Sequence, residues 1–567
     1  MMGSEDSFQF GYWTRRIRRR GVLRGGVAGG TALAMAACGT STKSGSSPAK
    51  SQPSSGAGKP RSGGAVNVAI TADPYDWDPS YAGAGGASSY GYHLAYNTVL
   101  GYKHGAGVRY DDLTLQPELA SSWEVPDAQT FIFYLRKGVK FAHLAPVNGR
   151  DLVANDLKFS FEYASRSGTL APKNLPVSQY ATYFEGILAV ETPDDSTVKV
   201  TFKSPFVPFI NYMASPFVPV VPHEIYDQDG HFKDQIVGSG PFQLDKASTQ
   251  VGSRWVWKKN PTYWDSGKPY IDQINQLVMK DDASAQAAFQ TRQLDLLETN
   301  NLDLTSINTI TKANPSIVKY ETVNLAPIHL YMSVKPPSPL ADIRLRQAIG
   351  LAIDRDEFLK TLYAGKGGWA LAGAFPDTYS QDEIRAMLKH DLTQAKLLVA
   401  AAGYPNGVDL QFDYPGNYFG QIYITQIQLL QAQLKQADIN LQLVSRTYDD
   451  YSTRRKQHNF TIEDTGKSVS GDVDSYLYSS FYPGSRDNYI EVNDPQLTPL
   501  LVAQRQETDA NKRREIVRQA AKRINVDQVW ALNLYNPLFW ALMQPRLQNY
   551  APHFVLTEPM ESAWLND

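Results

Sequence analysis

Few residues of this chain have the types and spacing that enzymatic chemistry requires. Gly466-Lys-Ser468 has the ending of a nucleotide-binding loop, but Thr461 stands where the leading glycine is needed. His223-Glu-Ile-Tyr-Asp227 lacks the second histidine of a zinc-binding helix, and the nine histidines include no pair at metal-ligand spacing. No Gly-x-Ser-x-Gly nucleophile turn occurs. The sequence therefore predicts no metal site, no cofactor and no catalytic residue, although a pair of carboxylates joined by folding is left open.

A glycine-rich segment, Gly238-Ser-Gly-Pro241, is the other place where a phosphate could bind. A phosphate loop needs its backbone N–H groups to open onto the N-terminus of a helix. Here the glycines lead into Phe242-Gln-Leu244, a polar turn and Arg254-Trp-Val-Trp257, a pattern typical of strand, turn and strand. We therefore expect a structural turn and not a ligand loop.

The N-terminus has the pattern of an export signal. Arg18-Arg-Arg-Gly-Val-Leu-Arg24 precedes the weakly apolar segment Gly25–Ala37, which ends in small residues before Cys38. The apolar segment is too short to span a membrane as a helix. Arg19 and Arg20, with the Gly-Val-Leu-Arg that follows, resemble a twin-arginine signal, and a Sec signal with extra arginines is the alternative.

The only cysteine of the chain, Cys38, has no partner for an internal disulfide. The ending Met35-Ala-Ala-Cys38 resembles a bacterial lipobox, in which the cysteine becomes the lipid-modified first residue. Residues 39–64 are almost wholly Ser, Gly, Lys, Pro, Ala, Thr and Gln, a composition that predicts a disordered tether. We therefore expect an extracytoplasmic protein, anchored to the cell membrane by its N-terminal lipid, at the cell surface or in the periplasm.

The rest of the chain has the composition of an ordinary globular protein and the length of two or three domains. Of its 567 residues 42% are hydrophobic and 20% are charged, the net charge is −2, and no basic run follows the N-terminus. Nucleic acid is therefore not an expected partner. Strands are predicted at 65–70, 130–135, 197–202 and 439–444, and helices at 342–353, 391–403 and 421–437. Helices that alternate with strands favour an α/β fold.

Several segments, in order along the chain, resemble the family 5 solute-binding proteins of ABC importers, which is the peptide, nickel and opine group. The matching segments are Leu115-Gln-Pro-Glu-Leu-Ala-Ser-Ser-Trp-Glu124, Tyr134-Leu-Arg-Lys-Gly-Val-Lys-Phe141 with Ala154-Asn-Asp156, Val237-Gly-Ser-Gly-Pro-Phe242 with Asn260-Pro-Thr-Tyr-Trp264, Pro339–Ile349 with Ala352-Ile-Asp-Arg355, and Ala395-Lys-Leu-Leu398 with Ala402-Gly-Tyr-Pro405. Together they cover nearly the whole chain from Gly64 onward.

The resemblance implies an α/β, two-lobed fold of the type II periplasmic-binding-protein kind, with an extra α+β domain in the first lobe. Strands should cross between the lobes near Asn324–Ser333 and Trp530–Tyr535. The expected division is a signal peptide with lipobox at 1–38, the tether at 39–64, the first lobe at 65–109, 236–330 and 531–567, the extra domain at 110–235, and the second lobe at 331–530.

The resemblance also implies that a solute is held between the lobes. Aromatic rings would stack on the solute, and carboxylates and a serine would fix its polar groups. The expected contacts are Tyr81, Ser89 and Tyr90 from the first lobe, and Tyr331, Trp369, Tyr418, Phe419, Asp472, Asp474 and Tyr476 from the second lobe and the crossover.

One departure from the family concerns the class of solute. Peptide-binding members often carry Trp-x-Ala-Asp before an Asp-Pro, and the first aspartate pairs with the peptide amine. If Asp472 aligns with the later aspartate, Val469 stands in the place of the amine partner, although Asp474 could substitute. Because a buried ammonium without a counter-charge costs several kcal/mol, the sequence favours an oligosaccharide or another non-peptide solute and leaves a peptide open.

The expected function is a membrane-tethered receptor that captures a small solute between two lobes and delivers it to the permease subunits of an ABC importer. The solute would not be altered chemically, and the receptor would act as a monomer. An exported hydrolase of carbohydrate with its active site in the cleft is one alternative. A sensory receptor on the same fold is the other.

Overall fold

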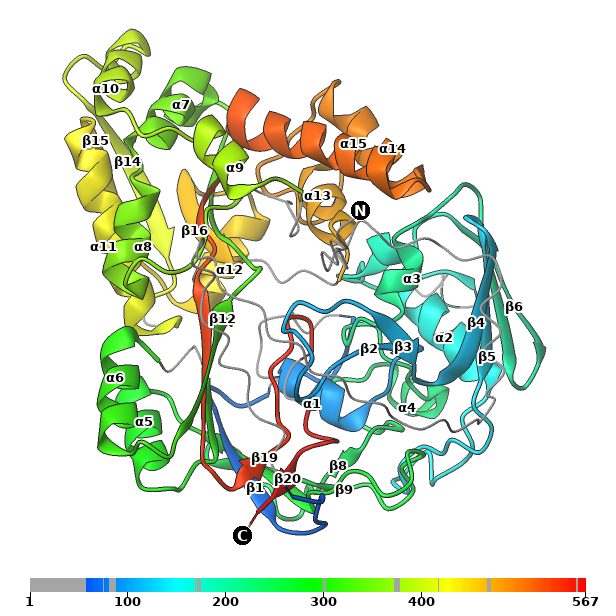
Figure 1. Ribbon diagram of the computed structural model, residues 1–567. Helices are drawn as coiled ribbons and strands as arrows, with labels where there is room; N and C mark the ends of the chain where they lie inside the picture. The colour runs from blue at the N-terminus through cyan, green and yellow to red at the C-terminus, as the bar shows by residue number, and fades with distance from the viewer. Residues whose placement is uncertain are drawn as a thin grey trace, which may run out of the picture.

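The computed structural model describes residues 58–566, apart from 75, 81–87, 169, 171–174, 299–301, 372–377, 417, 467–470 and 557–558. Figure 1 shows two lobes, each built on its own β-sheet, with an inserted domain beside them. The chain is an α/β protein, as the sequence predicted.

The first lobe is built on a seven-stranded sheet in the order β12-β18-β11-β1-β10-β9-β8. In chain order its strands are β1 (Ala65–Ile70), β8 (Phe242–Leu244), β9 (Arg254–Lys259), β10 (Gln273–Val278), β11 (Leu296–Glu298), β12 (Val318–Val323) and β18 (Leu538–Met543). Strand β1 runs parallel to β10 and β11, while β8, β9 and β10 form an antiparallel meander. The helices of this lobe are α1 (Ser88–Ala95), α5 (Asp282–Gln290) and α6 (Leu304–Ala313).

The second lobe is built on a five-stranded sheet in the order β15-β14-β16-β13-β17. Its strands are β13 (Ile328–Met332), β14 (Val408–Tyr414), β15 (Ile439–Ser445), β16 (Ile462–Gly466) and β17 (Ala531–Tyr535). Its helices are α7 (Ile343–Ala352), α8 (Arg355–Tyr363), α9 (Gln381–Met387), α10 (Leu392–Ala401), α11 (Gly420–Gln436), α12 (Tyr448–Lys456), α13 (Asp474–Phe481), α14 (Leu497–Gln506) and α15 (Ala510–Lys522). Aspartates accept hydrogen bonds from backbone N–H groups at the starts of α7, α8, α10 and α15, which is the capping that the sequence predicted for α7 and α10.

The chain passes from the first sheet to the second between β12 and β13, at residues 324–327, and returns between β17 and β18, at 536–537. Strand pairing limits each passage to a few residues. Because β17 pairs with β13, residues 531–535 belong to the second sheet, although we expected 531–567 to lie in the first lobe. Residues 328–330 of β13 are likewise in the second sheet. The two passages lie next to each other, because β12 pairs with β18 and β13 pairs with β17.

The inserted domain contains a four-stranded antiparallel sheet of β4 (Ala120–Asp127), β5 (Thr130–Leu135), β7 (Thr197–Phe202) and β6 (Ile187–Asp194). Alternate residues of β5 and β7 are buried, which is the pattern of a sheet with one face on a core. That face packs on α2 (Ala154–Ser165) and α3 (Phe209–Tyr212), where Phe209 contacts the rings of Phe131, Phe161 and Phe202. Helix α4 (His223–Asp229) and the short pair β2 (Leu100–Tyr102) and β3 (Leu115–Pro117) complete this region. Strands β19 (Leu547–Gln548) and β20 (Trp564–Leu565) pair near the C-terminus.

The glycine segment before β8 is a structural turn that packs on the end of α1. A Cβ atom at Gly238 would lie 2.1 Å from the carbonyl oxygen of Ala95, and one at Gly240 would lie 2.7 Å from it. The N–H of Gly240 donates to that carbonyl at 2.8 Å, and the side-chain amide of Asn260 donates to the carbonyl of Gly240 at 2.9 Å. The glycines are therefore needed for close backbone approach, as we expected from the strand that follows them.

Gly238→Ala should destabilise the protein, because the added methyl group has to displace the backbone of α1. We expect a loss of about 3 kcal/mol in the free energy of unfolding, measured by urea titration. Gly368→Ala is the control, since a Cβ there meets only the side chain of Gln381, at 3.5 Å. A Gly238→Ala protein as stable as the Gly368→Ala protein would contradict this account of the turn.

Candidate functional site

The inserted domain meets the second lobe through buried polar groups. Figure 1 shows α3 beside α13 and α14. The side-chain amide of Asn211 on α3 donates to Asp472 at 2.8 Å, and the Tyr212 hydroxyl donates to Asp474 at 2.7 Å. Beside them, the Tyr102 hydroxyl donates to the carbonyl of Asn211 at 2.8 Å and packs on Gly471, where a Cβ atom would overlap it. These contacts hold the two lobes together.

Both aspartates at this contact are paired with arginines of their own lobe. Arg513 donates to the two carboxylate oxygens of Asp472 at 2.6 and 3.1 Å. Arg505 donates to both carboxylate oxygens of Asp474 at 3.0 and 3.1 Å, and Gln504 donates to the same carboxylate. Burial raises the pKa of Asp474, and Arg505 opposes that rise. The two carboxylates are therefore balanced by charges of the protein itself.

Arg505 also crosses to the inserted domain. Its guanidinium donates to Glu185 at 2.7 Å and to the carbonyl of Thr182 at 2.7 Å, and it stacks over the ring of Tyr478, 3.5 Å from the centroid. Tyr478 in turn donates to Glu185 at 3.1 Å. We call Glu185, Asn211, Tyr212, Asp472, Asp474, Arg505 and Arg513 the interlobe polar cluster. Because a planar guanidinium can serve several acceptors at once, Arg505 ties one helix of the second lobe to two points of the inserted domain.

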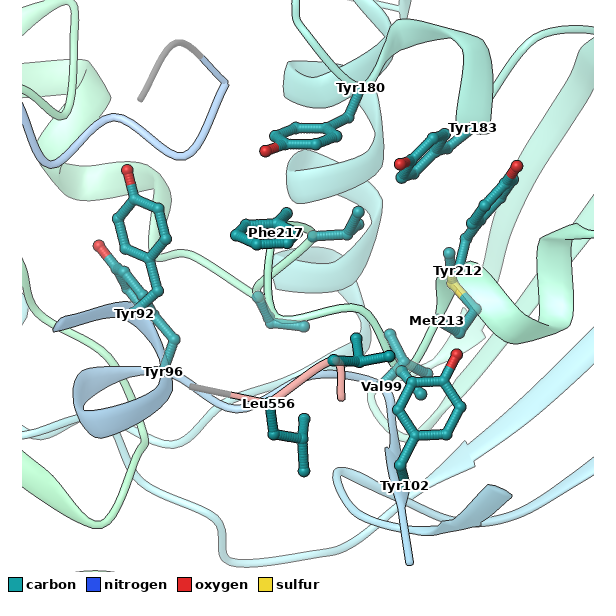
Figure 2. Packing of buried hydrophobic residues seen from close by; sticks show 14 of the residues in the cluster. Tyr92, Tyr96, Val99, Tyr102, Tyr180, Tyr183, Tyr212, Met213, Phe217 and Leu556 are labelled. Atoms are coloured by element: carbon teal, nitrogen blue, oxygen red, sulfur yellow. The ribbon is translucent and has the colours of Figure 1, made fainter. Parts of the chain in front are cut away.

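On the inserted-domain side of this contact, aromatic rings pack against one another. Tyr183 stacks on Tyr212 with centroids 3.8 Å apart, and Tyr180 stacks on Phe217 at 5.6 Å. Figure 2 shows these rings in one buried cluster with Tyr92 and Tyr96 of the first lobe. The many tyrosines of this region therefore pack against one another.

Tyr331 and Tyr476, both expected to contact the solute, lie close together in the second lobe. Tyr331 is on β13 and Tyr476 on α13, and both rings pack against His329, at 4.8 and 5.4 Å. All three side chains are buried. Burial raises the pKa of Tyr331 to about 12. These residues lie beside the passage at 324–327, which is where the two lobes join.

Trp369 has a different environment. Its indole N–H donates to Asp356 at 2.9 Å, and the guanidinium of Arg385 lies 4.4 Å from the ring centroid. Arg385 also donates to Asp356, at 2.7 and 2.9 Å. The ring is 7% exposed, so most of its surface is used in packing within the second lobe.

Tyr418 and Phe419 form a separate, exposed pair. They precede α11, each is 38% exposed, and Tyr418 stacks on Tyr448 with centroids 4.1 Å apart. No ring contact joins this pair to Tyr331, Tyr476 or Trp369 in the parts of the chain that the structure describes. Of the solute contacts expected from the first lobe, Ser89 and Tyr90 lie in α1. Tyr81, Val469, Cys38, Arg19 and Arg20 lie outside the described residues.

The sequence did not single out Glu298, the last residue of β11. Its side chain is half-buried and accepts a hydrogen bond from the Tyr550 hydroxyl at 2.7 Å. The rings of Tyr110, Tyr320, Phe539 and Phe554 lie around the same face of the first sheet. In the sequence, Glu298 is recognisable only as an acidic residue that follows apolar residues. Many surface residues have the same pattern, so it does not indicate a binding site.

Two further properties of the described residues bear on function. No group of three or more His, Cys, Asp or Glu side chains among them is placed to hold a metal ion. In the same part of the chain, no helix has the length and apolar character needed to cross a membrane.

Comparisons with known proteins identify the relatives of this chain. A family model described as bacterial extracellular solute-binding proteins, family 5 Middle, matches residues 114–488. The heme-binding protein A of Haemophilus influenzae is 24% identical over 538 residues, which is 91% of this chain and 94% of that protein. The dipeptide-binding protein of Escherichia coli is 27% identical over 453 residues, covering 75% of this chain and 80% of that protein.

Solved structures show the same fold. The periplasmic binding protein DppA from Helicobacter pylori, in complex with peptide STSA, superposes with a TM-score of 0.77 at 22% identity, covering 89% of this chain and 99% of that one. The binding protein AgaA in complex with agropinic acid, from A. tumefacien R10, gives a TM-score of 0.75 at 23% identity, with the same two coverages. The fold is therefore the two-lobed type II fold of periplasmic binding proteins, with an extra domain, as the sequence predicted.

Arg505→Met should destabilise the protein, because it leaves the buried Asp474 without its counter-charge and removes two contacts to the inserted domain. We expect the free energy of unfolding to fall by about 3–5 kcal/mol in urea titrations. Arg344→Met is the control, because Arg344 and its partner Asp342 form a solvent-exposed pair, and such pairs contribute at most about 1 kcal/mol. Equal losses in the two variants would show that the interlobe polar cluster does not stabilise the fold.

Proposed function

Because the chain belongs to the bacterial extracellular solute-binding proteins of family 5, we propose that it captures a small solute between its two lobes and delivers it, unaltered, to the permease of an ABC importer. The family match over residues 114–488 carries this proposal. The fold agrees with it, since the chain passes between the two sheets in short segments at 324–327 and 536–537.

The geometry supports a hinge mechanism. The two passages are adjacent in space, so a few backbone torsions there can change the angle between the lobes without disturbing either sheet. A solute that contacts both lobes binds the closed form better than the open form, and it therefore shifts the population toward closure. The permease would recognise the closed form. The interlobe polar cluster favours closure on the side of the inserted domain.

The proposed solute contacts are the residues expected from the sequence, with two different roles. Tyr331 and Tyr476, beside the passage at 324–327, would contact the solute with Tyr81, Ser89 and Tyr90 of the first lobe. We place Trp369, Tyr418 and Phe419 at the outer parts of the same site. Asp472 and Asp474 already have protein partners, and we infer that they fix the position of the loop before α13 and act on the solute through it.

The proposed solute is a peptide, an oligosaccharide or a related small molecule. Relatives of the chain are named for heme and for dipeptides, and one solved neighbour is in complex with agropinic acid. We further propose that the protein performs no catalysis and acts as a monomer.

The family is extracytoplasmic, and we propose that this member is held at the membrane by a lipid on Cys38. The export signal with Arg19 and Arg20, the lipobox that ends at Cys38, and the tether of residues 39–64 support this arrangement. Such a tether of about 25 residues gives a root-mean-square reach of roughly 25–30 Å, enough for the folded body to meet a permease in the same membrane.

Mass spectrometry of the purified protein tests the function. We expect a stoichiometric small molecule to be released intact on denaturation. After the emptied protein is refolded, adding that molecule should reduce the radius of gyration measured by small-angle X-ray scattering. Chemical turnover of the molecule would favour the hydrolase alternative. The absence of both a bound molecule and a change in the radius of gyration would contradict the proposal.

Cys38→Ser should release the full-length protein from the membrane fraction of cells that process bacterial lipoproteins, because the lipid is attached through the cysteine sulfur. Fractionation and immunoblotting measure the change. Ser41→Ala, three residues further along the tether, is the control and should remain in the membrane fraction. A Cys38→Ser protein that stays in the membrane fraction would show that another element holds it there.

A further inference from the structure

Strand register places Glu298 in a row with a small residue and a tyrosine on one face of the first sheet. Glu298 of β11 pairs with Ala541 of β18, and Ala541 pairs with Tyr320 of β12. Directly paired residues of antiparallel strands project their side chains to the same face. Ala541 therefore leaves room between the carboxylate and the tyrosine ring. The next residue of β18 on that face, Phe539, lies one step closer to the passage at 536–537.

Four aromatic rings pack together beside this row. The ring of Tyr110 lies 5.1 Å from Phe539, 6.0 Å from Phe554 and 6.5 Å from Tyr320. The backbone joins these parts, because the N–H of Phe554 donates to the carbonyl of Tyr110 at 2.8 Å. Tyr110 and Tyr320 are 6% exposed, whereas Phe539 and Phe554 keep more accessible surface, as Glu298 does. Phe539, Phe554 and Glu298 are thus the members of the group that remain partly accessible.

Among the described residues, the Glu298 carboxylate has one hydrogen-bond donor and no positively charged partner. The Tyr550 hydroxyl donates to it at 2.7 Å, and no ion pair involving it occurs among the residues that the structure describes. Burial raises its pKa to about 7. Glu298 differs from Asp472 and Asp474, which both have arginine partners.

We propose that Glu298, together with the rings of Tyr110, Tyr320, Phe539 and Phe554, binds a positively charged ammonium or guanidinium group of the solute. Aromatic rings beside a carboxylate suit a cation, because aromatic faces attract positive charge and the carboxylate supplies the counter-charge. A cation that approaches this partly buried carboxylate would add a charge-assisted contact to the one hydrogen bond from Tyr550. This subsite rests on the proposed function, and it names a chemical feature of the solute.

The subsite also bears on the class of solute. The sequence lacks an acidic residue at position 469 in the second lobe, which argued against an amine-bearing solute. Glu298 supplies a negative partner from the opposite lobe. A solute with a positively charged end and an apolar or aromatic neighbouring part fits these residues, and a neutral oligosaccharide does not use them.

A matched pair of probes tests the subsite without knowledge of the natural solute. Tetramethylammonium chloride carries a compact positive charge, and neopentyl alcohol has a similar size without the charge. At pH 8 and constant ionic strength, tetramethylammonium should raise the melting temperature of the wild-type protein, and neopentyl alcohol should not. Glu298→Gln should weaken the cation binding by about tenfold or more, since it removes a desolvated charge partner. Phe539→Leu should weaken it several-fold.

The pH dependence gives an independent measurement. Since the free carboxyl has a pKa of about 7, tetramethylammonium should bind the wild-type protein more tightly at pH 8 than at pH 5. Glu298→Gln should remove this difference, and the control Glu124→Gln, on the exposed surface of β4, should retain it. Equal binding of the cation by wild-type and Glu298→Gln protein, or no binding by the wild-type protein, would overturn the subsite.

The outcomes separate this inference from the function on which it rests. If mass spectrometry identifies a captured solute without a positive group and the cation probe does not bind, the subsite is wrong and the receptor function stands. If no solute is captured and the lobes do not close, but the probe binds through Glu298, the receptor function is wrong and the cation site stands.

Discussion

The structure depends on the way in which strand pairing divides the chain between two sheets. Strands β12 and β18 pair in the first sheet, and their immediate continuations β13 and β17 pair in the second. Backbone hydrogen bonds therefore fix each lobe as a unit and leave only 324–327 and 536–537 to join them. Any group that binds both lobes must act across these two short segments, so a small difference in interlobe contacts changes the population of the closed form.

The carboxylates of the two lobes have different partners. In the interlobe polar cluster, Asp472 and Asp474 each have an arginine within 3.1 Å and a donor from the inserted domain. A balanced cluster of this kind fixes the relative position of the parts that it joins. For Glu298 the described part of the chain offers a tyrosine hydroxyl as donor and no arginine. A carboxylate of this kind is chemically suited to a positively charged partner that arrives from outside the protein.

The two observations together give a physical picture of capture. Contacts between the inserted domain and α13–α14 favour closure on one side, and they involve only protein groups. The solute would supply the remaining interactions, through the rings beside the passage at 324–327 and through the carboxylate of Glu298. In the proposed subsite, a solute that carries a cation would complete closure by pairing with Glu298.

The sequence by itself determined the class of fold and the family, because these follow from local features: strand and helix periodicity, aspartate caps at α7 and α10, the Gly238–Pro241 turn, and family motifs in a fixed order. It also located the join between the lobes to within a few residues. Only the tertiary structure decided which side chains meet. Asp472 and Asp474 are matched by Arg513 and Arg505, more than thirty residues away along the chain, and Tyr110 packs against Phe539 and Phe554 from distant segments. Such contacts depend on register and lobe packing, which no local pattern records.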